Sequence, residues 1–220
     1  PALEVNPFER SKSGPMAAGI RLTTPVVYVI DTGGSMLDIL DYAKFITLVS
    51  VQSLAEGEKF AVLLCRESRD TFIRSAADMA ERPEEDSPES APAPAGEVYL
   101  SAGPEGLQAI AKALQVRTSV ALGATDRSRA LRKAFIQVPA PKTVVLLTRD
   151  GMDDLDALIA DAKSAGIRVV PFALDSDPIT RAAFARLAAE TGGESKEFSV
   201  AELDEYSRRP GIQRPKILQE

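Results

Sequence analysis

The stretch VVYVIDTGGSM, residues 26–36, joins a strongly apolar run to a short polar loop. Residues 26–30 are β-branched or aromatic without interruption, which is typical of a parallel strand that is buried on both faces. The run ends at Asp31, and two glycines and Ser35 follow soon after it. We therefore expect a buried strand whose carboxyl end carries a functional loop.

The overall composition is that of a globular protein and disfavours several kinds of function. The chain has 220 residues, of which 45% are hydrophobic and 26% charged, enough for one α/β domain with a full core. Its net charge of -6 argues against nucleic acid as a partner, because phosphate binding needs clustered Lys and Arg. No apolar run approaches the roughly 18 residues that a membrane-spanning helix needs.

The chain contains no histidine and one cysteine. The absence of histidine removes imidazole bases, Ser-His-Asp triads and the usual zinc sites. Cys65 lies in the apolar run FAVLLC, so we expect a buried strand thiol rather than a reactive nucleophile. A single cysteine allows no intramolecular disulfide.

Apolar runs alternate with amphipathic segments along most of the chain. We expect strands at 26–30, 60–65, 71–74, 143–147, 167–174 and 196–199, with helices over 38–57, from 104, around 130–135, over 153–166, over 177–192 and over 201–206. In the helix opened by Asp177, we expect Ile179, Ala183 and Leu187 to face inward. Such alternation requires crossover connections and predicts an α/β fold, with a doubly wound, mostly parallel, six-stranded sheet flanked by helices on both faces.

The pattern also predicts how the chain divides. Residues 1–24 have little periodicity and are expected to form an irregular N-terminal lead-in, and residues 25–207 the folded domain. Residues 79–96, MAERPEEDSPESAPAPAG, are rich in Pro, Ala, Glu and Ser and lack an apolar face, so we expect a flexible acidic insertion. Residues 208–220 are expected to be a peripheral, proline-broken tail.

Three kinds of site carry an acid, glycines and a hydroxyl at the end of a strand. An aspartic protease would use the triplet Asp31-Thr32-Gly33, but it needs two such carboxylates, and the segments after this triplet are expected to be helical. A phosphate-binding hairpin would use the glycine amides, but residues 37–55 have helical length and no Gly or Pro to turn a hairpin. The third kind is a metal-binding loop.

Several segments of the chain together resemble the von Willebrand factor A (vWA) domain and its metal-ion-dependent adhesion site. Residues 31–36, DTGGSM, are similar to the Asp-x-Ser-x-Ser loop of that family. LGATDRSRAL resembles its second metal loop, VVLLTRDGMDD its third strand and loop, and FARLAAETGGESKEF the end of the fold. The resemblance covers about residues 25–207 and implies the Rossmann-like vWA fold.

The resemblance implies a metal site made by Asp31, Ser35, Thr125 and Asp150. Carboxylate and hydroxyl oxygens suit a hard cation, so we expect Mg²⁺ or Mn²⁺ as the cofactor. Because two of these ligands are neutral, the bound ion would keep positive character toward solvent. A protein partner is then expected to complete the metal shell with an acidic side chain, as the resemblance implies for adhesion-type members.

The sequence departs from the family pattern at two positions. Gly33 stands where the family has its first serine, which removes one hydroxyl ligand. Arg149 is inserted between Thr148 and Asp150, where the family reads Thr-Asp-Gly. The extra residue either turns Asp150 away from the site or brings the Arg149 guanidinium near the carboxylates, where it competes with a metal.

We therefore expect a non-catalytic, adhesion-type interaction domain that binds a protein partner at the carboxyl edge of its sheet. Two alternatives stay open: a vWA-fold scaffold with a vestigial, metal-free site, and a phosphate-handling enzyme that uses Asp31. Ser35 has a second interpretation as the cap of the following helix. Extracellular or membrane-tethered placement is common among vWA relatives and intracellular members exist, so the compartment stays open.

Overall fold

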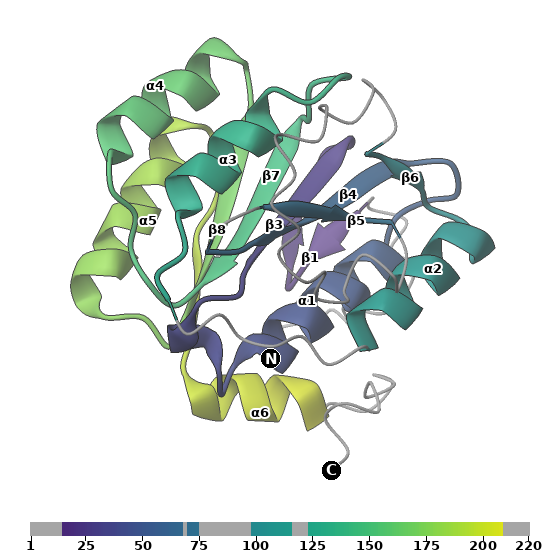
Figure 1. Ribbon diagram of the computed structural model, residues 1–220, viewed down its shortest axis with the longest axis horizontal. Coiled ribbons are helices and arrows are strands. Elements are labelled where there is room, and N and C mark those ends of the chain that lie inside the picture. Colours follow the sequence, from purple (N-terminus) through teal and green to yellow (C-terminus); the bar gives the residue numbers. More distant parts are fainter. Residues whose placement is uncertain (1–14, 68–69, 75–97, 116–122, 209–220) are drawn as a thin grey trace, which may run out of the picture.

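One mostly parallel sheet organises the structure, a computed structural model that describes residues 15–67, 70–74, 98–115 and 123–208 (Figure 1). Its strand order is β5-β4-β3-β7-β8-β9, and β6 pairs with β4. Neighbouring strands from β4 through β9 along this order are parallel, whereas β5 and β6 are antiparallel to β4. The strands are β3 (Val26–Asp31), β4 (Lys59–Cys65), β5 (Thr71–Ile73), β6 (Leu100–Ser101), β7 (Thr143–Thr148), β8 (Arg168–Leu174) and β9 (Lys196–Phe198).

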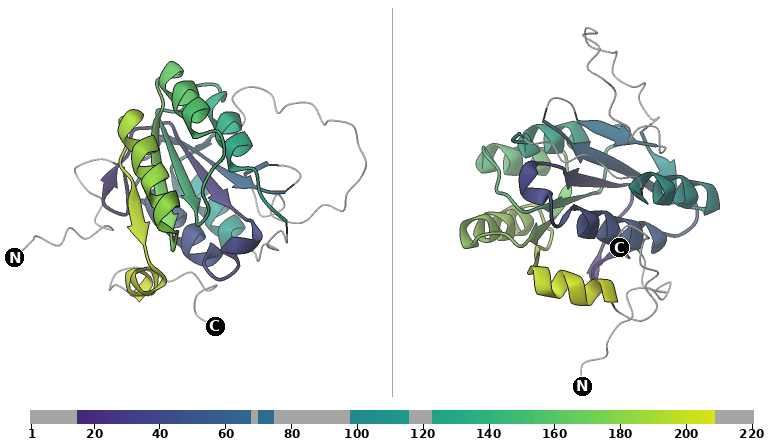
Figure 2. Two further views of the ribbon diagram at one scale, coloured as in Figure 1. Left: turned by 90° about the vertical axis from the view of Figure 1, so that its left-hand side faces the viewer. Right: turned by 60° about the horizontal axis from the view of Figure 1, so that its bottom comes forward.

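Helices cover both faces of this sheet, as the alternating pattern predicts (Figures 1 and 2). The side chains of β3 point alternately into two separate hydrophobic clusters, one on each face. One cluster is completed by α1 (Leu40–Gln52), α2 (Pro104–Gln115) and α6 (Val200–Arg208). The other is completed by α3 (Arg127–Phe135), α4 (Leu155–Ser164) and α5 (Pro178–Glu190).

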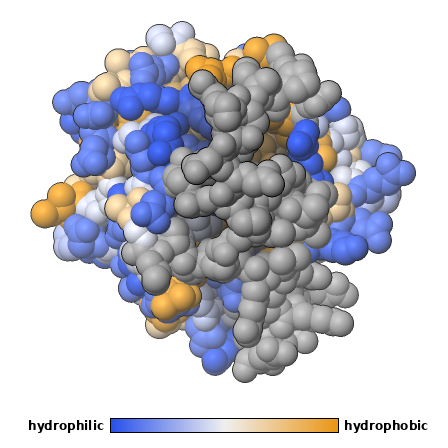
Figure 3. All heavy atoms as spheres, in the orientation of Figure 1, coloured by the Kyte–Doolittle hydropathy of each residue, from blue (hydrophilic) through white to orange (hydrophobic). Residues whose placement is uncertain are grey.

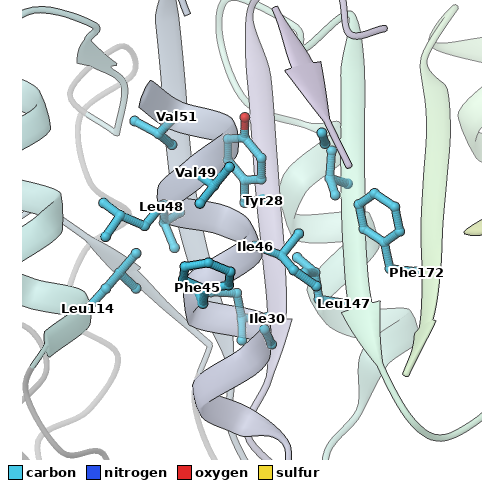
Figure 4. Packing of buried hydrophobic residues seen from close by; sticks show 14 of the residues in the cluster. Tyr28, Ile30, Phe45, Ile46, Leu48, Val49, Val51, Leu114, Leu147 and Phe172 are labelled. Atoms are coloured by element: carbon cyan, nitrogen blue, oxygen red, sulfur yellow. The ribbon is translucent and has the colours of Figure 1, made fainter. Parts of the chain in front are cut away.

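Helix α1 is buried almost all round, because elements pack on both its sides. Apolar side chains of α1 pack against residues of the sheet and of α2 (Figure 4). The α1 side chains are Phe45, Ile46, Leu48, Val49 and Val51, and their neighbours are Tyr28, Ile30, Leu114, Leu147 and Phe172. The Tyr28 hydroxyl meets Ser50 Oγ at 2.7 Å, which satisfies both buried groups. The helix expected over 38–57 is thus a buried helix between the sheet and its neighbours.

The expected irregular lead-in is wrong for the residues directly before β3. Met16–Ala17 (β1) and Ile20–Arg21 (β2) form a two-stranded antiparallel sheet that packs on α1. Ala17 and Ile20 are buried in the same cluster as α1. Too few residues alternate here for a strand pattern to be visible in the sequence.

Three further expectations need correction. The sheet has seven strands rather than six, because β6 adds a two-residue antiparallel pair. Helix α1 begins at Leu40 rather than at Asp38, because residues 34–36 form a short 3₁₀ helix, η1 (Gly34–Met36), first. Ile179 is exposed rather than inward, because α5 buries Thr180, Phe184, Leu187 and Ala188 instead. The acidic insertion 79–96 and residues 209–220 of the expected tail lie outside the described residues.

The strand order reverses at β3, which places a site at the carboxyl edge. The chain passes from β3 to β4 on one side of it, and later to β7 on the other side. In open α/β sheets, ligands bind beyond the carboxyl ends of the strands at such a point. The loops after β3 and β7 meet here. No helix in the described part of the chain has the length and apolar character required to cross a membrane.

Candidate functional site at the carboxyl edge

Asp31 is the centre of a buried polar cluster. It is the last residue of β3, and its side chain is fully buried. Its Oδ1 accepts hydrogen bonds from the Gly33 amide at 2.9 Å and the Thr125 hydroxyl at 2.6 Å. Its Oδ2 accepts from the Thr148 hydroxyl at 2.7 Å and from Arg127 Nη1 at 3.3 Å. These donors fill the roughly four lone-pair positions that a carboxylate offers.

Arg127 inserts a positive charge between the loops. It is the first residue of α3, and its side chain is only 17% exposed. Its Nη1 lies 3.1 Å from Thr125 Oγ1 and 3.7 Å from Asp150 Oδ2, and its Nε donates to the Gly151 carbonyl at 2.7 Å. A helix dipole disfavours a cation in the first turn, so these polar contacts hold the guanidinium in place.

Ser35 and Asp150 form a second, more exposed pair. Ser35 Oγ donates to Asp150 Oδ2 at 2.7 Å. Ser35 lies within η1, and no side chain caps α1, whose N-cap is Ile39, so the interpretation of Ser35 as the cap of the following helix is wrong. The inserted Arg149 does not turn Asp150 away, because the Asp150 amide folds back onto Thr148 Oγ1 at 3.2 Å. The four residues expected in the site thus meet as two pairs, which Arg127 connects.

Arg149 pairs with carboxylates at the rim rather than with those of the expected metal site. Its guanidinium donates to both oxygens of Asp38, at 2.9 and 3.0 Å, and to Asp175 at 3.2 Å. It also donates to the Ser35 carbonyl at 2.8 Å. The hydrogen bond from Arg149 lowers the pKa of the Asp38 carboxyl. Arg149 therefore ties the loops after β3 and β8 together at the rim of the site.

Sequence reasoning missed Thr148 and Arg127. Thr148 is the last residue of β7, and its position at a strand end beside Asp31 was the available signal. Arg127 stands two residues after Thr125 in the segment that resembles a metal loop. A basic residue at the start of a helix was the signal there, because such a residue needs an anionic partner.

The arrangement does not fit a magnesium ion. Asp31 has no free lone pair, and the Thr125 hydroxyl already donates to Asp31 and accepts from Arg127. A Cβ on Gly33 would lie 2.9 Å from Thr125 Oγ1, so the serine of the family pattern has no room here. A doubly charged ion about 4 Å from the guanidinium would meet a repulsion of about 8 kcal/mol at an effective dielectric constant of about 20. In the described residues, no group of three or more Cys, Asp or Glu offers another metal cage.

A phosphate-binding hairpin and a reactive thiol both find no support in the geometry. After Asp31 the chain continues into η1 and α1, not into the second strand of a phosphate-binding hairpin. Cys65 is buried, and burial together with the Asp31 and Asp70 carboxylates raises the pKa of its thiol well above the ordinary value. The thiol is therefore a packed strand residue, as expected.

Comparisons with known proteins agree with this architecture. A family model described as von Willebrand factor type A domain matches residues 24–196. No curated protein matches the sequence. Among solved structures, the human COPII-coat protein Sec24c is similar over 81% of this chain, with 12% identity and a TM-score of 0.52; the match spans 30% of the Sec24c chain. The SpRpn10 VWA domain matches 84% of this chain and 94% of its own, with 8% identity and a TM-score of 0.48.

Proposed function

The chain belongs to the von Willebrand factor type A domain family, and from this premise we propose that it is a non-catalytic protein-interaction domain. Its partner binds at the carboxyl edge of the sheet, on the loops that follow β3, β7, β8 and β9. The contact is made by apolar and acidic side chains rather than through a metal ion.

Exposed apolar side chains at the carboxyl edge carry this proposal. Leu37, between η1 and α1, is 75% exposed, and Ile179, in the first turn of α5, is 83% exposed. Single exposed apolar residues are common on proteins. These two, however, lie on loops that are held together, because Arg149 donates hydrogen bonds to both Asp38 and Asp175. On the face shown in Figure 3, the apolar residues of the described surface form separate patches. A rigid edge with two projecting apolar side chains suits a protein partner.

The charge of the same edge specifies what the partner offers. The guanidinium groups of Arg127 and Arg149 are only 17% and 22% exposed and are engaged by carboxylates. Carboxylates outnumber them on the surrounding loops: Asp38, Asp126, Asp150, Asp153, Asp154, Asp175 and Asp177. Electrostatic complementarity therefore favours an apolar partner surface bordered by Lys or Arg. Arg127 and Arg149 would offer no unpaired guanidinium to an acidic side chain from the partner.

The buried groups of the site support a binding role over a catalytic one. The chain has no histidine, and its one thiol is buried with a raised pKa. Every acceptor position of Asp31 is used internally, so this carboxylate does not reach a substrate. The phosphate-handling alternative would need Asp31 to be free.

Site-specific photocrosslinking tests this function. A photoreactive phenylalanine analogue is placed at position 37 or 179 and irradiated in an extract of the source cells. We expect both positions to yield an adduct with the same partner protein, undiminished by EDTA and weakened by high salt.

The matched control is position 136. Ile136 is 76% exposed, but it lies at the end of α3, at the opposite edge of the sheet. The proposal fails if position 136 gives the same adduct as strongly as positions 37 and 179. It also fails if the partner is captured from 136 and from neither of the others.

A further inference from the structure

The Arg127 guanidinium stands where the loops after β3, α2 and β7 converge. Its Nη1 contacts Asp31 Oδ2, Thr125 Oγ1 and Asp150 Oδ2 at 3.3, 3.1 and 3.7 Å. Three of the four residues that resemble metal ligands thus surround one cationic nitrogen. The Arg127 Nη1 nitrogen therefore occupies the position that a hard cation would need in order to contact these three oxygens.

The hydrogen bonds around this nitrogen are complete. The Thr125 hydroxyl accepts a hydrogen bond from Arg127 and donates one to Asp31 Oδ1 at 2.6 Å. The Arg127 Nε is fixed separately by the Gly151 carbonyl at 2.7 Å. A guanidinium held at two ends and only 17% exposed has little freedom to leave the cluster.

The missing serine belongs to the same arrangement. A side chain at position 33 would collide with Thr125 Oγ1, which lies 2.9 Å from the ideal Cβ position, and would press on Asp31 Oδ1 at 3.3 Å. Gly33 therefore lets Thr125 close directly onto Asp31. The glycine at 33 and the arginine at 127 together give one closed site in which the Asp31 carboxylate is paired with the guanidinium.

We propose that Arg127 is a tethered cation that takes the place of a divalent metal ion in this domain. The site is closed to Mg²⁺ and Mn²⁺ while Arg127 is present, and its loops are organised at every metal concentration. Removing the guanidinium leaves Asp31, Ser35, Thr125 and Asp150 around an uncompensated space, which a hard cation then fills. The inference concerns the buried cluster and does not depend on partner binding.

Manganese titration of purified variants tests the proposal. The wild-type chain and Arg127→Ala are titrated with MnCl₂ by calorimetry, and their melting temperatures are compared in MnCl₂ and in NaCl of equal ionic strength with EDTA. We expect no saturable heat and no specific melting shift for the wild type. Arg127→Ala should melt lower and recover in a saturable manner with Mn²⁺, and adding Asp31→Asn should abolish that recovery.

Two further variants make the outcome specific. Arg127→Lys keeps a positive charge and should not respond to Mn²⁺. Arg132→Ala removes another arginine of α3, one whose partners are the exposed Asp154 and Asp161, and should also not respond. If Arg127→Ala does not fold, Arg127→Gln replaces it. Saturable Mn²⁺ binding by the wild type that Asp31→Asn removes would overturn the proposal, as would a folded Arg127→Ala or Arg127→Gln that ignores Mn²⁺.

Discussion

Substituting serine for Gly33 should destabilise the domain, although serine is the residue of the family pattern. The added Cβ lies 2.9 Å from Thr125 Oγ1 and 3.4 Å from its Cγ2. Because Thr125 is buried, its side chain cannot change rotamer without a cost in free energy. Either Thr125 shifts or the loop around residue 33 does. In both cases the 2.6 Å hydrogen bond from Thr125 to the Asp31 carboxylate is strained or lost.

The magnitude follows from these two effects. Overpacking a filled site costs about 1–3 kcal/mol, and weakening a hydrogen bond to a charged group adds about 1 kcal/mol or more. We expect a loss of about 3 kcal/mol in the free energy of unfolding. In a domain of this size, that corresponds to a fall of about 6–12 °C in the melting temperature.

Urea and thermal unfolding in EDTA measure this loss, with Gly103→Ser as the control. A Cβ on Gly103 meets only Glu56 Cγ, at 3.9 Å, so the control should be neutral. The double variant Gly33→Ser/Thr125→Ala removes the colliding atoms and should be less destabilised than the sum of its single variants. A melting temperature of Gly33→Ser within about 1 °C of wild type would refute the packing described here.

Three other predictions address the same cluster and its surroundings. Asp31→Asn leaves hydroxyl and guanidinium donors facing an amide, so we expect a loss of about 3 kcal/mol, read from the urea midpoint; an unchanged midpoint would contradict it. Cys65 should not react with a thiol reagent at pH 8 until the protein unfolds, because burial raises its pKa and keeps the thiol protonated; labelling of native protein at the rate of a free thiol would contradict this. The pKa of Asp38 is lowered from its ordinary value of 3.8 by Arg149, so its contribution to stability is complete above that value and is lost as the pH falls through the lower, folded-state pKa. Arg149→Ala should therefore flatten the acid limb of a stability-versus-pH curve, and an acid limb identical to wild type would argue against this ion pair.

The regular part of the fold was predictable from the sequence because its signals are local. The continuous run of β-branched and aromatic residues at 26–30 predicted the central strand, which is buried throughout. Asp177 and Pro178 predicted the start of α5, and the Asp177 side chain accepts hydrogen bonds from the amides of Ile179 and Thr180. Gly166, at a φ of +65°, ends α4 as a glycine in that conformation does.

The parts that sequence could not give depend on tertiary contacts. Whether Ile179 or Thr180 is buried depends on how α5 is rotated about its axis against β8. The short apolar pattern of this helix does not determine that rotation. Arg149 directly precedes Asp150 and Arg127 stands two residues after Thr125, and only the folded loops decide that Arg149 reaches Asp38 whereas Arg127 reaches Asp31. The expected strand 143–147 stops one residue short of Thr148, yet the Thr148 hydroxyl completes the hydrogen bonding of Asp31.

The most direct test of whether Arg127 takes the place of a metal ion is anomalous diffraction from crystals of the wild-type domain soaked in MnCl₂. We predict no anomalous peak among Asp31, Thr125 and Asp150, with the Arg127 guanidinium in hydrogen-bonding contact with Asp31. A manganese peak about 2.2 Å from the Asp31 carboxylate, with Arg127 turned out of the cluster, would contradict it.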